Sequence, residues 1–380
     1  EGKRHERHHR GQARPRRREV IVCSPHCGLR HDSTSGGEVY ERELLPRLAP
    51  LVGEVHAPTA RPGPPGVRYE RIWPRWGLRW PVMPLAMLPA IRRCWRAHRF
   101  DLLRAHSLRF VGPSCVLASR RLGVPLVAQC LHVDPPSPWD GIDRWVARAA
   151  ARVVTISDFS KRQIVARYGV PEHRILIARP GVGPEFCPAR QFRPQGRTKT
   201  LLFVGGLKPR KDPLFLADIL AAVVRRGVDA RLVVVGDGPL RGALTSRLRA
   251  LGVRERATLM GRVADEDRPW IYKTADVLVF PSRLEGFGMP VLEAMASGVP
   301  VVCSWAGALA ELVRYGVNGY THETRDPEGY AFLICTLLDT SRPRRVLTRQ
   351  DIIHEGLLTV KRHTWEKTAT AWAQACKEAT

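Results

Sequence analysis

Residues 275–298, with the sequence ADVLVFPSRLEGFGMPVLEAMASG, decide the fold class of this chain. The apolar run 277–280 predicts a buried strand, and the segment from about Pro290 to Ser297 predicts a helix. Pro290 suits the first helical position, where its missing N–H costs nothing, and Gly298 suits a left-handed stop. A strand, a glycine-rich loop and a helix in this order are typical of one βα unit of a parallel sheet.

The loop between this strand and this helix predicts an anion site. Gly286 and Gly288 have no Cβ, so backbone N–H groups can approach a ligand closely. The helix N-terminus behind them adds unpaired donors and a partial positive charge, which favours phosphate. Glu285 and Glu293 frame the loop. Because a carboxylate repels phosphate, we expect both to accept hydrogen bonds from hydroxyls, as on a ribose and a sugar. The alternative is an ordinary connection with two solvated glutamates.

The rest of the chain repeats the βα pattern in two series. From Glu19 onward, short β-branched runs alternate with helical segments, and the polar, proline-containing residues 187–199 separate the two series. A chain of 380 residues is long enough for two domains with separate cores. We therefore expect an α/β protein with two Rossmann-like parallel-sheet domains, 19–186 and 200–357, joined by the 187–199 linker. Residues 1–18 are rich in arginine without apolar periodicity, which predicts a disordered basic tail.

Candidate ligand groups follow the predicted strands in both series. In the first, Gly36 and Gly37 precede a helix, and His106 and His132 follow predicted strands. In the second, each apolar strand ends in a glycine-containing or polar loop, and Lys211 follows the first strand. Ligands of open parallel sheets bind at the carboxyl ends of the strands, so two such edges facing each other predict a cleft with a phosphate site on each wall. Lys211 would there neutralise charge on a departing phosphate; taken alone, it is better interpreted as a solvated loop cation.

Net charge is a weaker guide to partners. A value of +25 suggests nucleic acid or an anionic surface, but only nine of the 61 basic residues are lysine. That ratio is typical of the codon usage of a GC-rich genome, so we do not expect nucleic acid as a partner. Nucleic-acid binding by the basic tail is the alternative.

We expect no resident metal and no membrane-spanning segment. No D-x-D or Asp-rich cluster lies near the predicted strand ends, which argues against a magnesium site. No apolar run approaches the roughly 18–20 residues that cross a bilayer, and nine scattered cysteines fit a reduced cytoplasmic interior. Residues 58–84 are rich in proline and contain Trp73, Trp76 and Trp80, which predicts a packed surface loop. The alternative is an exposed basic and hydrophobic surface for peripheral membrane contact.

Several motifs in this chain occur together in one family. They are EGFGMPVLE with its E-x7-E spacing from Glu285 to Glu293, GGLKPRK around Lys211, VGDGP (235–239), YGVNGY (315–320) and, in the first series, SGGEVYERELL, RAHS and CLH. In these motifs the chain resembles the retaining, metal-independent glycosyltransferases of family 4, which have the GT-B fold. The resemblance runs from about Val20 to the C-terminus and is strongest in 201–320.

The resemblance implies roles for individual residues. Glu285 would contact the donor sugar near the reacting carbon, Glu293 would bind the ribose hydroxyls, and Lys211 would hold the diphosphate. His132 would contact the donor sugar on the acceptor side, and residues 261–263 would lie by the base. The terminal segment 358–380 would return to the first domain as a helix. Catalytic roles are thus implied for Glu285, His132 and Lys211, and donor binding for Gly36, Gly37, Gly206, Lys211, Arg262, Val263, Glu285, Gly286, Phe287, Gly288, Met289 and Glu293.

One position departs from the family pattern. Many relatives have arginine five residues before the lysine, where this chain has Gly206. Half of the usual cationic clamp is therefore absent. Lys208 or Arg210 is the candidate substitute, and loss of activity is the alternative.

The expected function is a glycosyltransferase that moves a sugar from a nucleotide-diphosphate sugar to an acceptor hydroxyl with retention. The expected partners are the nucleotide sugar and a small-molecule or lipid-linked glycan acceptor, in natural-product or cell-envelope biosynthesis. The expected location is cytoplasmic, with peripheral contact at the inner face of the membrane as an option. The alternatives are an epimerase or a non-catalytic sugar-nucleotide binder of the same fold.

Overall fold

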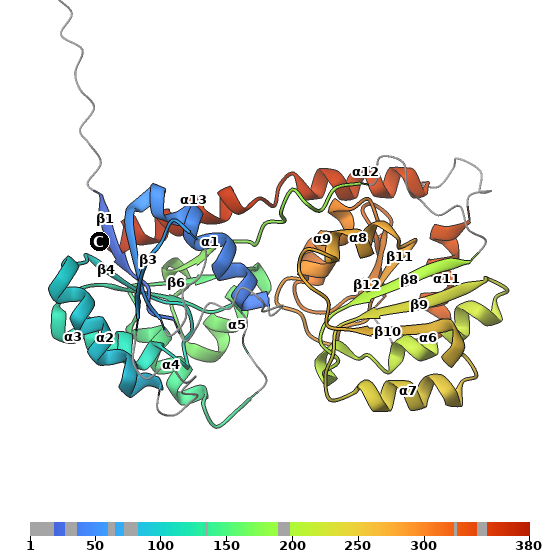
Figure 1. Cartoon of the computed structure of the whole chain (residues 1–380), viewed down its shortest axis with the longest axis horizontal. Coiled ribbons are helices and arrows are strands. Elements are labelled where there is room, and N and C mark those ends of the chain that lie inside the picture. Colours follow the sequence, from blue (N-terminus) through green and yellow to red (C-terminus); the bar gives the residue numbers. More distant parts are fainter. Residues whose placement is uncertain are drawn as a thin grey trace, which may run out of the picture.

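The computed structural model describes residues 19–26, 36–59, 65–71, 83–131, 133, 136–188, 198–322, 325–339 and 348–380. The predicted basic tail, most of the predicted linker, His132 and the three tryptophans Trp73, Trp76 and Trp80 lie outside these residues. Figure 1 shows two α/β lobes side by side, each built on a parallel sheet. The predicted fold class is confirmed.

The first lobe contains a seven-stranded parallel sheet in the order β3-β2-β1-β4-β5-β6-β7. Its strands are β1 Val20–Cys23, β2 Gly53–Thr59, β3 Arg68–Arg71, β4 Leu102–Ala105, β5 Leu126–Gln129, β6 Arg152–Thr155 and β7 Ile175–Ile177. Its helices are α1 Gly36–Val52, α2 Met83–His98, α3 Gly112–Leu122, α4 Asp140–Ala149 and α5 Asp158–Tyr168. The strands are short, largely apolar and buried, because helices cover both faces of a parallel sheet.

The second lobe contains a six-stranded parallel sheet in the order β10-β9-β8-β11-β12-β13. Its strands are β8 Lys199–Val204, β9 Ala230–Val235, β10 Ala257–Gly261, β11 Val277–Phe280, β12 Val301–Ser304 and β13 Tyr320–His322. Its helices are α6 Phe215–Arg225, α7 Arg241–Ala250, α8 Arg268–Lys273, α9 Met289–Ala296, α10 Leu309–Leu312 and α11 Pro327–Leu338. The strand order reverses between β8 and β11, which places the loops that carry Lys211 and Glu285 side by side at the switch point.

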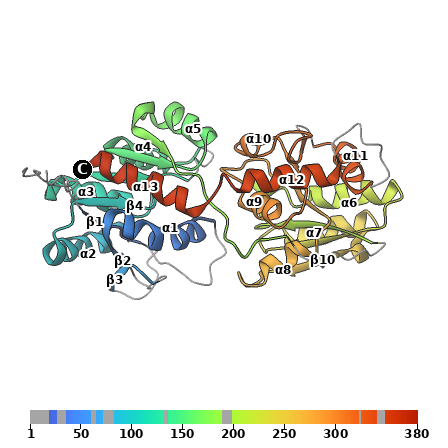
Figure 2. The same cartoon turned by 90° about the horizontal axis from the view of Figure 1, so that it is seen from above.

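Two C-terminal helices connect the lobes. Helix α12 (Arg349–Val360) packs on α9, and α13 (Trp365–Ala379) packs on α1 of the first lobe. In Figures 1 and 2 these helices run along one side of the molecule, from one lobe to the other. The side chain of Trp372 is fully buried, and its indole N–H donates to the Tyr40 hydroxyl over 2.9 Å. The end of the chain is therefore part of the first lobe's core.

The stretch 275–298 folds nearly as its sequence predicts. The strand spans Val277–Phe280, and Gly298 has a left-handed φ of 70°. The helix spans Met289–Ala296, one residue earlier at each end than expected, so Pro290 occupies its second position rather than its first. Within the described part of the chain, no helix is both long enough and apolar enough to cross a membrane.

Candidate active site

Lys211 and Glu285 form a buried ion pair at the switch point of the second sheet. Lys211 ends a short 3-10 turn (Pro209–Lys211) after β8, and Glu285 lies in the loop after β11. The ammonium of Lys211 donates a hydrogen bond to the Glu285 carboxylate and lies 4.5 Å from the centre of the Phe280 ring. Each residue is more than nine-tenths buried. An ordinary solvated cation is therefore the wrong interpretation for Lys211.

Burial and charge act on this pair in opposite directions. Burial alone would raise the pKa of Glu285, but the adjacent Lys211 and Arg210 charges hold that pKa below its usual value. Burial lowers the pKa of Lys211, although the carboxylate opposes that shift. We take both groups as ionised, since a buried carboxylate is stabilised by a cation in contact with it. Arg210 also lies near, with a guanidinium nitrogen 4.0 Å from the carboxylate.

The turn that carries Lys211 is stabilised by the residue that follows it. Asp212 follows it in a left-handed conformation with φ of 49°, which is unusual for a residue with a side chain. Its carboxylate accepts hydrogen bonds from Arg283 and Arg325, each over 3.0 Å. Two arginines from later loops of the same lobe thus stabilise an otherwise strained backbone directly beside the lysine.

The Glu285 loop is held by close backbone contacts that require glycine. Gly288 has φ of 98°, and a Cβ there would lie 2.5 Å from the Leu309 side chain. Gly307 has φ of 58°, and its Cβ would lie 2.3 Å from the Glu285 carbonyl oxygen. That carbonyl accepts a hydrogen bond from the Ala308 N–H over 2.9 Å. The loop after β12 therefore supports the loop after β11.

Glu293 lies about one turn into α9, in a different environment. Its carboxylate accepts hydrogen bonds from the Tyr272 hydroxyl over 2.7 Å and from Arg268 over 3.3 Å. Burial raises the pKa of Glu293 above its usual value, while Arg268 and the Tyr272 hydroxyl oppose the shift. Burial also raises the pKa of Tyr272 well above its ordinary range, so its hydroxyl stays protonated and donates.

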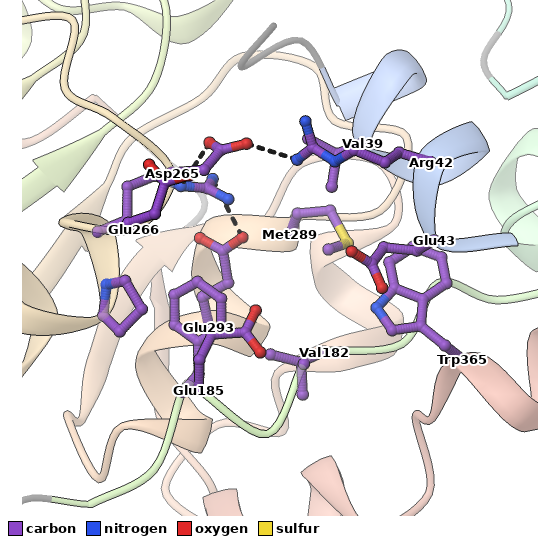
Figure 3. Close-up of a pocket in the computed structure, with 14 residues that line it drawn as sticks. Val39, Arg42, Glu43, Val182, Glu185, Asp265, Glu266, Met289, Glu293 and Trp365 are labelled. Atoms are coloured by element: carbon purple, nitrogen blue, oxygen red, sulfur yellow. Dashed lines mark hydrogen bonds and ion pairs between the residues drawn. The ribbon is translucent and has the colours of Figure 1, made fainter. Parts of the chain in front are cut away.

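A chain of ion pairs connects Glu293 to the first lobe. Arg268 pairs with Asp265 over 3.2 Å, and Asp265 pairs with Arg42 of α1. Figure 3 shows Arg42 and Asp265 facing each other beside Glu293. Because Arg42 and Asp265 belong to different lobes, this contact links α1 to the predicted ribose carboxylate.

A pocket of about 510 Å³ lies between the lobes at this point. That volume is within the range of small-molecule sites. Glu293 and Met289 line it, whereas Glu285, Lys211 and the glycine pair Gly36 and Gly37 do not. Its remaining lining residues are Val39, Arg42, Glu43, Val182, Gly183, Glu185, Phe186, Asp265, Glu266, Arg268, Pro269 and Trp365.

Two comparisons with known families divide the chain between them. Residues 34–186 match the family described as Glycosyltransferase Family 4, and residues 198–340 match Glycosyl transferases group 1. D-inositol 3-phosphate glycosyltransferase 2 of Catenulispora acidiphila is 30% identical over 414 aligned positions, which cover 94% of each chain. This chain belongs to glycosyltransferase family 4. Members of the family use nucleotide sugars and retain the anomeric configuration.

Solved structures share the fold of this family 4 chain. Sucrose-phosphate synthase of Thermosynechococcus elongatus superposes with a TM-score of 0.78 at 19% identity, covering 94% of this chain and 98% of that one. The Anabaena protein HepE, in complex with UDP and glucose, superposes with a TM-score of 0.75 at 19% identity, covering 94% of this chain and 99% of that one. At these identities the likeness supports the GT-B fold alone.

The structure brings together most of the predicted donor-site residues of the second lobe. Lys211 and Glu285 touch, Gly286 and Gly288 follow in the same loop, and Met289 begins α9. Phe287 is buried, with its ring 5.6 Å from that of His363. At Gly206 an added Cβ would meet nothing closer than 3.8 Å, with the Lys208 side chain at 3.9 Å. The position therefore has room for a side chain, and Lys208 lies beside it.

The predicted base-side residues lie at the end of β10. Gly261 has φ of 76°, and its carbonyl oxygen accepts a hydrogen bond from the Gly236 N–H over 2.7 Å. Arg262 is exposed and Val263 is half-buried. Neither residue lines the pocket that contains Glu293.

The first lobe supplies fewer of the expected groups. Gly36 and Gly37 begin α1. No atom of the described residues lies within 4 Å of the Cβ position at Gly36, and the Leu131 side chain lies 3.6 Å from that of Gly37. The Nδ1 of His106 lies 2.9 Å from the Pro25 carbonyl, so that nitrogen must carry the proton. Burial lowers the pKa of His106, which favours this neutral form.

The sequence does not predict the partners of Glu293, which are Tyr272 and Arg268, nor the Asp265–Arg42 pair that continues from Arg268. The sequence does contain one indication for Arg42. Arg42 lies one turn after Glu38 on the helix that begins at the glycine pair, and this position is near the predicted edge of the cleft. Tyr272 and Arg268 carry no motif, because their function depends on how α8 packs on α9.

Proposed function

We propose that this family 4 enzyme transfers a sugar from a UDP-sugar to an acceptor hydroxyl, with Lys211 and Glu285 at the reacting centre. The single observation that carries the proposal is the buried Lys211–Glu285 pair at the switch point of the second sheet. A buried cation beside a glycine-rich loop and a helix N-terminus is a site for an anionic leaving group. The HepE complex with UDP and glucose, on the same fold, supports uracil as the base.

In the proposed reaction, the bond between the anomeric carbon and the diphosphate oxygen breaks. Charge that develops on the diphosphate is stabilised by Lys211, by backbone N–H groups of the 286–288 loop and by the N-terminus of α9. The acceptor oxygen forms the new glycosidic bond on the same face. Its proton passes to the departing phosphate oxygen, so that no separate protein base is needed. Glu285 orients Lys211 and accepts a hydrogen bond from the donor sugar.

The nucleoside is proposed to occupy the pocket that Glu293 lines. There the Glu293 carboxylate would accept hydrogen bonds from the ribose hydroxyls, with Tyr272 and Arg268 fixing its orientation. Gly206, Arg262 and Val263 are proposed to border the phosphates and the base. His132, which lies outside the described residues, is proposed to contact the donor sugar.

The acceptor is proposed to be a polar hydroxyl compound of natural-product or cell-envelope biosynthesis. Relatives named D-inositol 3-phosphate glycosyltransferase and O-antigen chain mannosyltransferase B fit a small phosphorylated polyol or a lipid-linked glycan. The first lobe would bind this acceptor opposite the donor.

The test is incubation of the purified chain with UDP-, GDP-, ADP- and dTDP-sugars, with and without a panel of acceptors. We expect UDP release with a UDP-sugar, slow donor hydrolysis without acceptor, and a glycoside of retained configuration with the right acceptor. Glu255→Ala, which changes an exposed carboxylate of the second lobe, is the control and should leave the rates unchanged. An epimerised nucleotide sugar without glycoside, or binding without any turnover, would contradict transfer.

A further inference from the structure

The carboxylate of Glu311 reaches from the second lobe to a helix of the first. Glu311 lies in α10, after β12, and accepts hydrogen bonds from the backbone N–H groups of Asp158 and Phe159. These are the first two residues of α5, whose N–H groups have no partner within the helix. A carboxylate at this end also interacts favourably with the helix dipole. The contact therefore satisfies two orphan donors across the gap between the lobes.

The same short helix supports the loop that carries Glu285. Its N-cap residue Ala308 donates to the Glu285 carbonyl over 2.9 Å, and the Glu311 N–H donates to the Ala308 carbonyl over 3.1 Å. The neighbouring Gly307 approaches Glu285 so closely that only glycine fits. One turn of helix thus touches α5 of the first lobe at one end and the Glu285 loop at the other.

We propose that Glu311 is a positioning residue that couples closure of the two lobes to the placement of Glu285. When the lobes close, the Glu311 carboxylate binds the N-terminus of α5, and this contact fixes the position of α10. Because Ala308 of the same turn donates to the Glu285 carbonyl, the backbone of Glu285 is fixed as well. When the lobes separate, the contact between Glu311 and α5 is lost. The Glu285 loop then keeps only its contacts within the second lobe. The proposal rests on the proposed role of Glu285 at the reacting centre.

The first experiment removes one backbone donor from α5. Asp158→Pro deletes the N–H that lies 3.0 Å from Glu311. The backbone accepts proline there, because residue 158 is the first helical position and Ser157 before it is extended, with φ of −155° and ψ of 160°. Asp158→Ala is the matched control, since it removes the same side chain, and with it the ion pair to Arg179, but keeps the N–H.

The second experiment removes the carboxylate itself. Glu311→Ala loses both interlobe hydrogen bonds. Glu355→Ala is its control. Glu311 lies 3.5 Å from Arg162 of the first lobe, and Glu355 lies 3.5 Å from Arg314. The control therefore removes an ion pair of the same length that lies entirely within the second lobe. Two quantities are measured for each variant: the radius of gyration by small-angle X-ray scattering, with and without UDP, and the rates of transfer and donor hydrolysis.

We expect Glu311→Ala to enlarge the radius of gyration without UDP and to lower kcat about 10-fold, since two charge-assisted hydrogen bonds that fix α10 are lost. The ratio of donor hydrolysis to transfer should rise, because an open cleft admits water. Asp158→Pro should show the same changes to a smaller degree, and both controls should match the wild type.

Two outcomes would overturn the proposal. One is a wild-type kcat and hydrolysis ratio in Glu311→Ala; the other is equal behaviour of Asp158→Pro and Asp158→Ala. A lowered melting temperature with unchanged kcat would show that Glu311 only stabilises the fold. The scattering measurement needs no turnover, so it tests the interlobe contact even if the wild type transfers no sugar, which would count against the proposed function alone.

Discussion

Glu285 and Glu293 lie on one loop and helix, eight residues apart, yet their surroundings differ in kind. Glu285 pairs with the single ammonium of Lys211, and its pKa is held below the usual value. Glu293 is bound by a phenol and a guanidinium that is shared with Asp265, and its pKa is raised. Both carboxylates are buried, so burial alone does not separate them.

The difference fits the different tasks proposed for the two carboxylates. In the proposed reaction Lys211 moves its hydrogen bond from Glu285 to the diphosphate, which a flexible point charge allows. Glu293 is fixed from two directions by Tyr272 and Arg268, which suits a carboxylate that must offer its oxygens in one orientation. The first pair is suited to chemistry and the second to recognition. Variants of these residues test the contrast.

The largest effect is expected at Glu285. Glu285→Ala should lower kcat by about 10²-fold or more, as when a group that acts on the transition state is lost. UDP affinity, measured by calorimetry, should change little. The exposed carboxylate variant Glu255→Ala should keep the wild-type kcat. An unchanged kcat in Glu285→Ala would refute its place at the reacting centre.

Lys211 should affect stability as well as turnover. Lys211→Met leaves Glu285 buried without its cation, which should destabilise the fold by about 3 kcal/mol. The double variant Lys211→Met/Glu285→Gln buries no unpaired charge and should recover most of that loss while remaining inactive. Denaturant titrations of the single and double variants measure the difference. Equal midpoints for Lys211→Met and the wild type would mean that the pair is not buried as described.

At Glu293 the effect should fall on binding. Glu293→Ala should raise the Kd for UDP about 10-fold and leave kcat at saturating donor nearly unchanged, since ground-state and transition-state binding are lost together. Tyr272→Phe removes one donor and should raise the Kd about 3-fold, the loss of a single hydrogen bond. If UDP binding is unaltered in both variants, the ribose role is wrong.

The smallest effect is in the pH dependence of stability. Glu285 has a lowered folded-state pKa, so the stability that it contributes is present above pH 4.5 and is lost as the pH falls. Glu293 has a raised pKa, so its contribution is present below pH 4.5 and is lost as the pH rises through the folded-state value. Melting temperatures of wild type, Glu285→Gln and Glu293→Gln across this range should give differences of opposite slope. Parallel slopes would remove the contrast between the two carboxylates.

Much of this site could be predicted because its parts are local. The loop from Glu285 to Gly288 and the helix after it follow from glycine, proline and apolar spacing, which act within a few residues. Lys211 could be placed on the same wall because the carboxyl ends of parallel strands share one edge. The contact between Lys211 and Glu285 fits that expectation.

The partners of Glu293 and the contact of Glu311 with the N-terminus of α5 could not be predicted in this way. Arg42 and Asp265 are 223 residues apart, and Phe159 and Glu311 are 152 apart. No periodicity connects such residues, because their approach depends on how one lobe is placed against the other. Even within the second lobe, Tyr272 reaches Glu293 only because α8 packs on α9.

Local sequence patterns were enough to predict two parallel sheets covered by helices, the glycine-rich loop after β11 and the carboxylates that frame it. These follow from backbone preferences and side-chain alternation, which are properties of short segments. Packing of the whole chain is what pairs Glu285 with a lysine and Glu293 with a tyrosine and an arginine. It also brings Arg42 and Glu311 into contact with the opposite lobe. The physical reason is that a pKa and a hydrogen bond depend on distances of a few ångströms, which packing sets and local sequence does not.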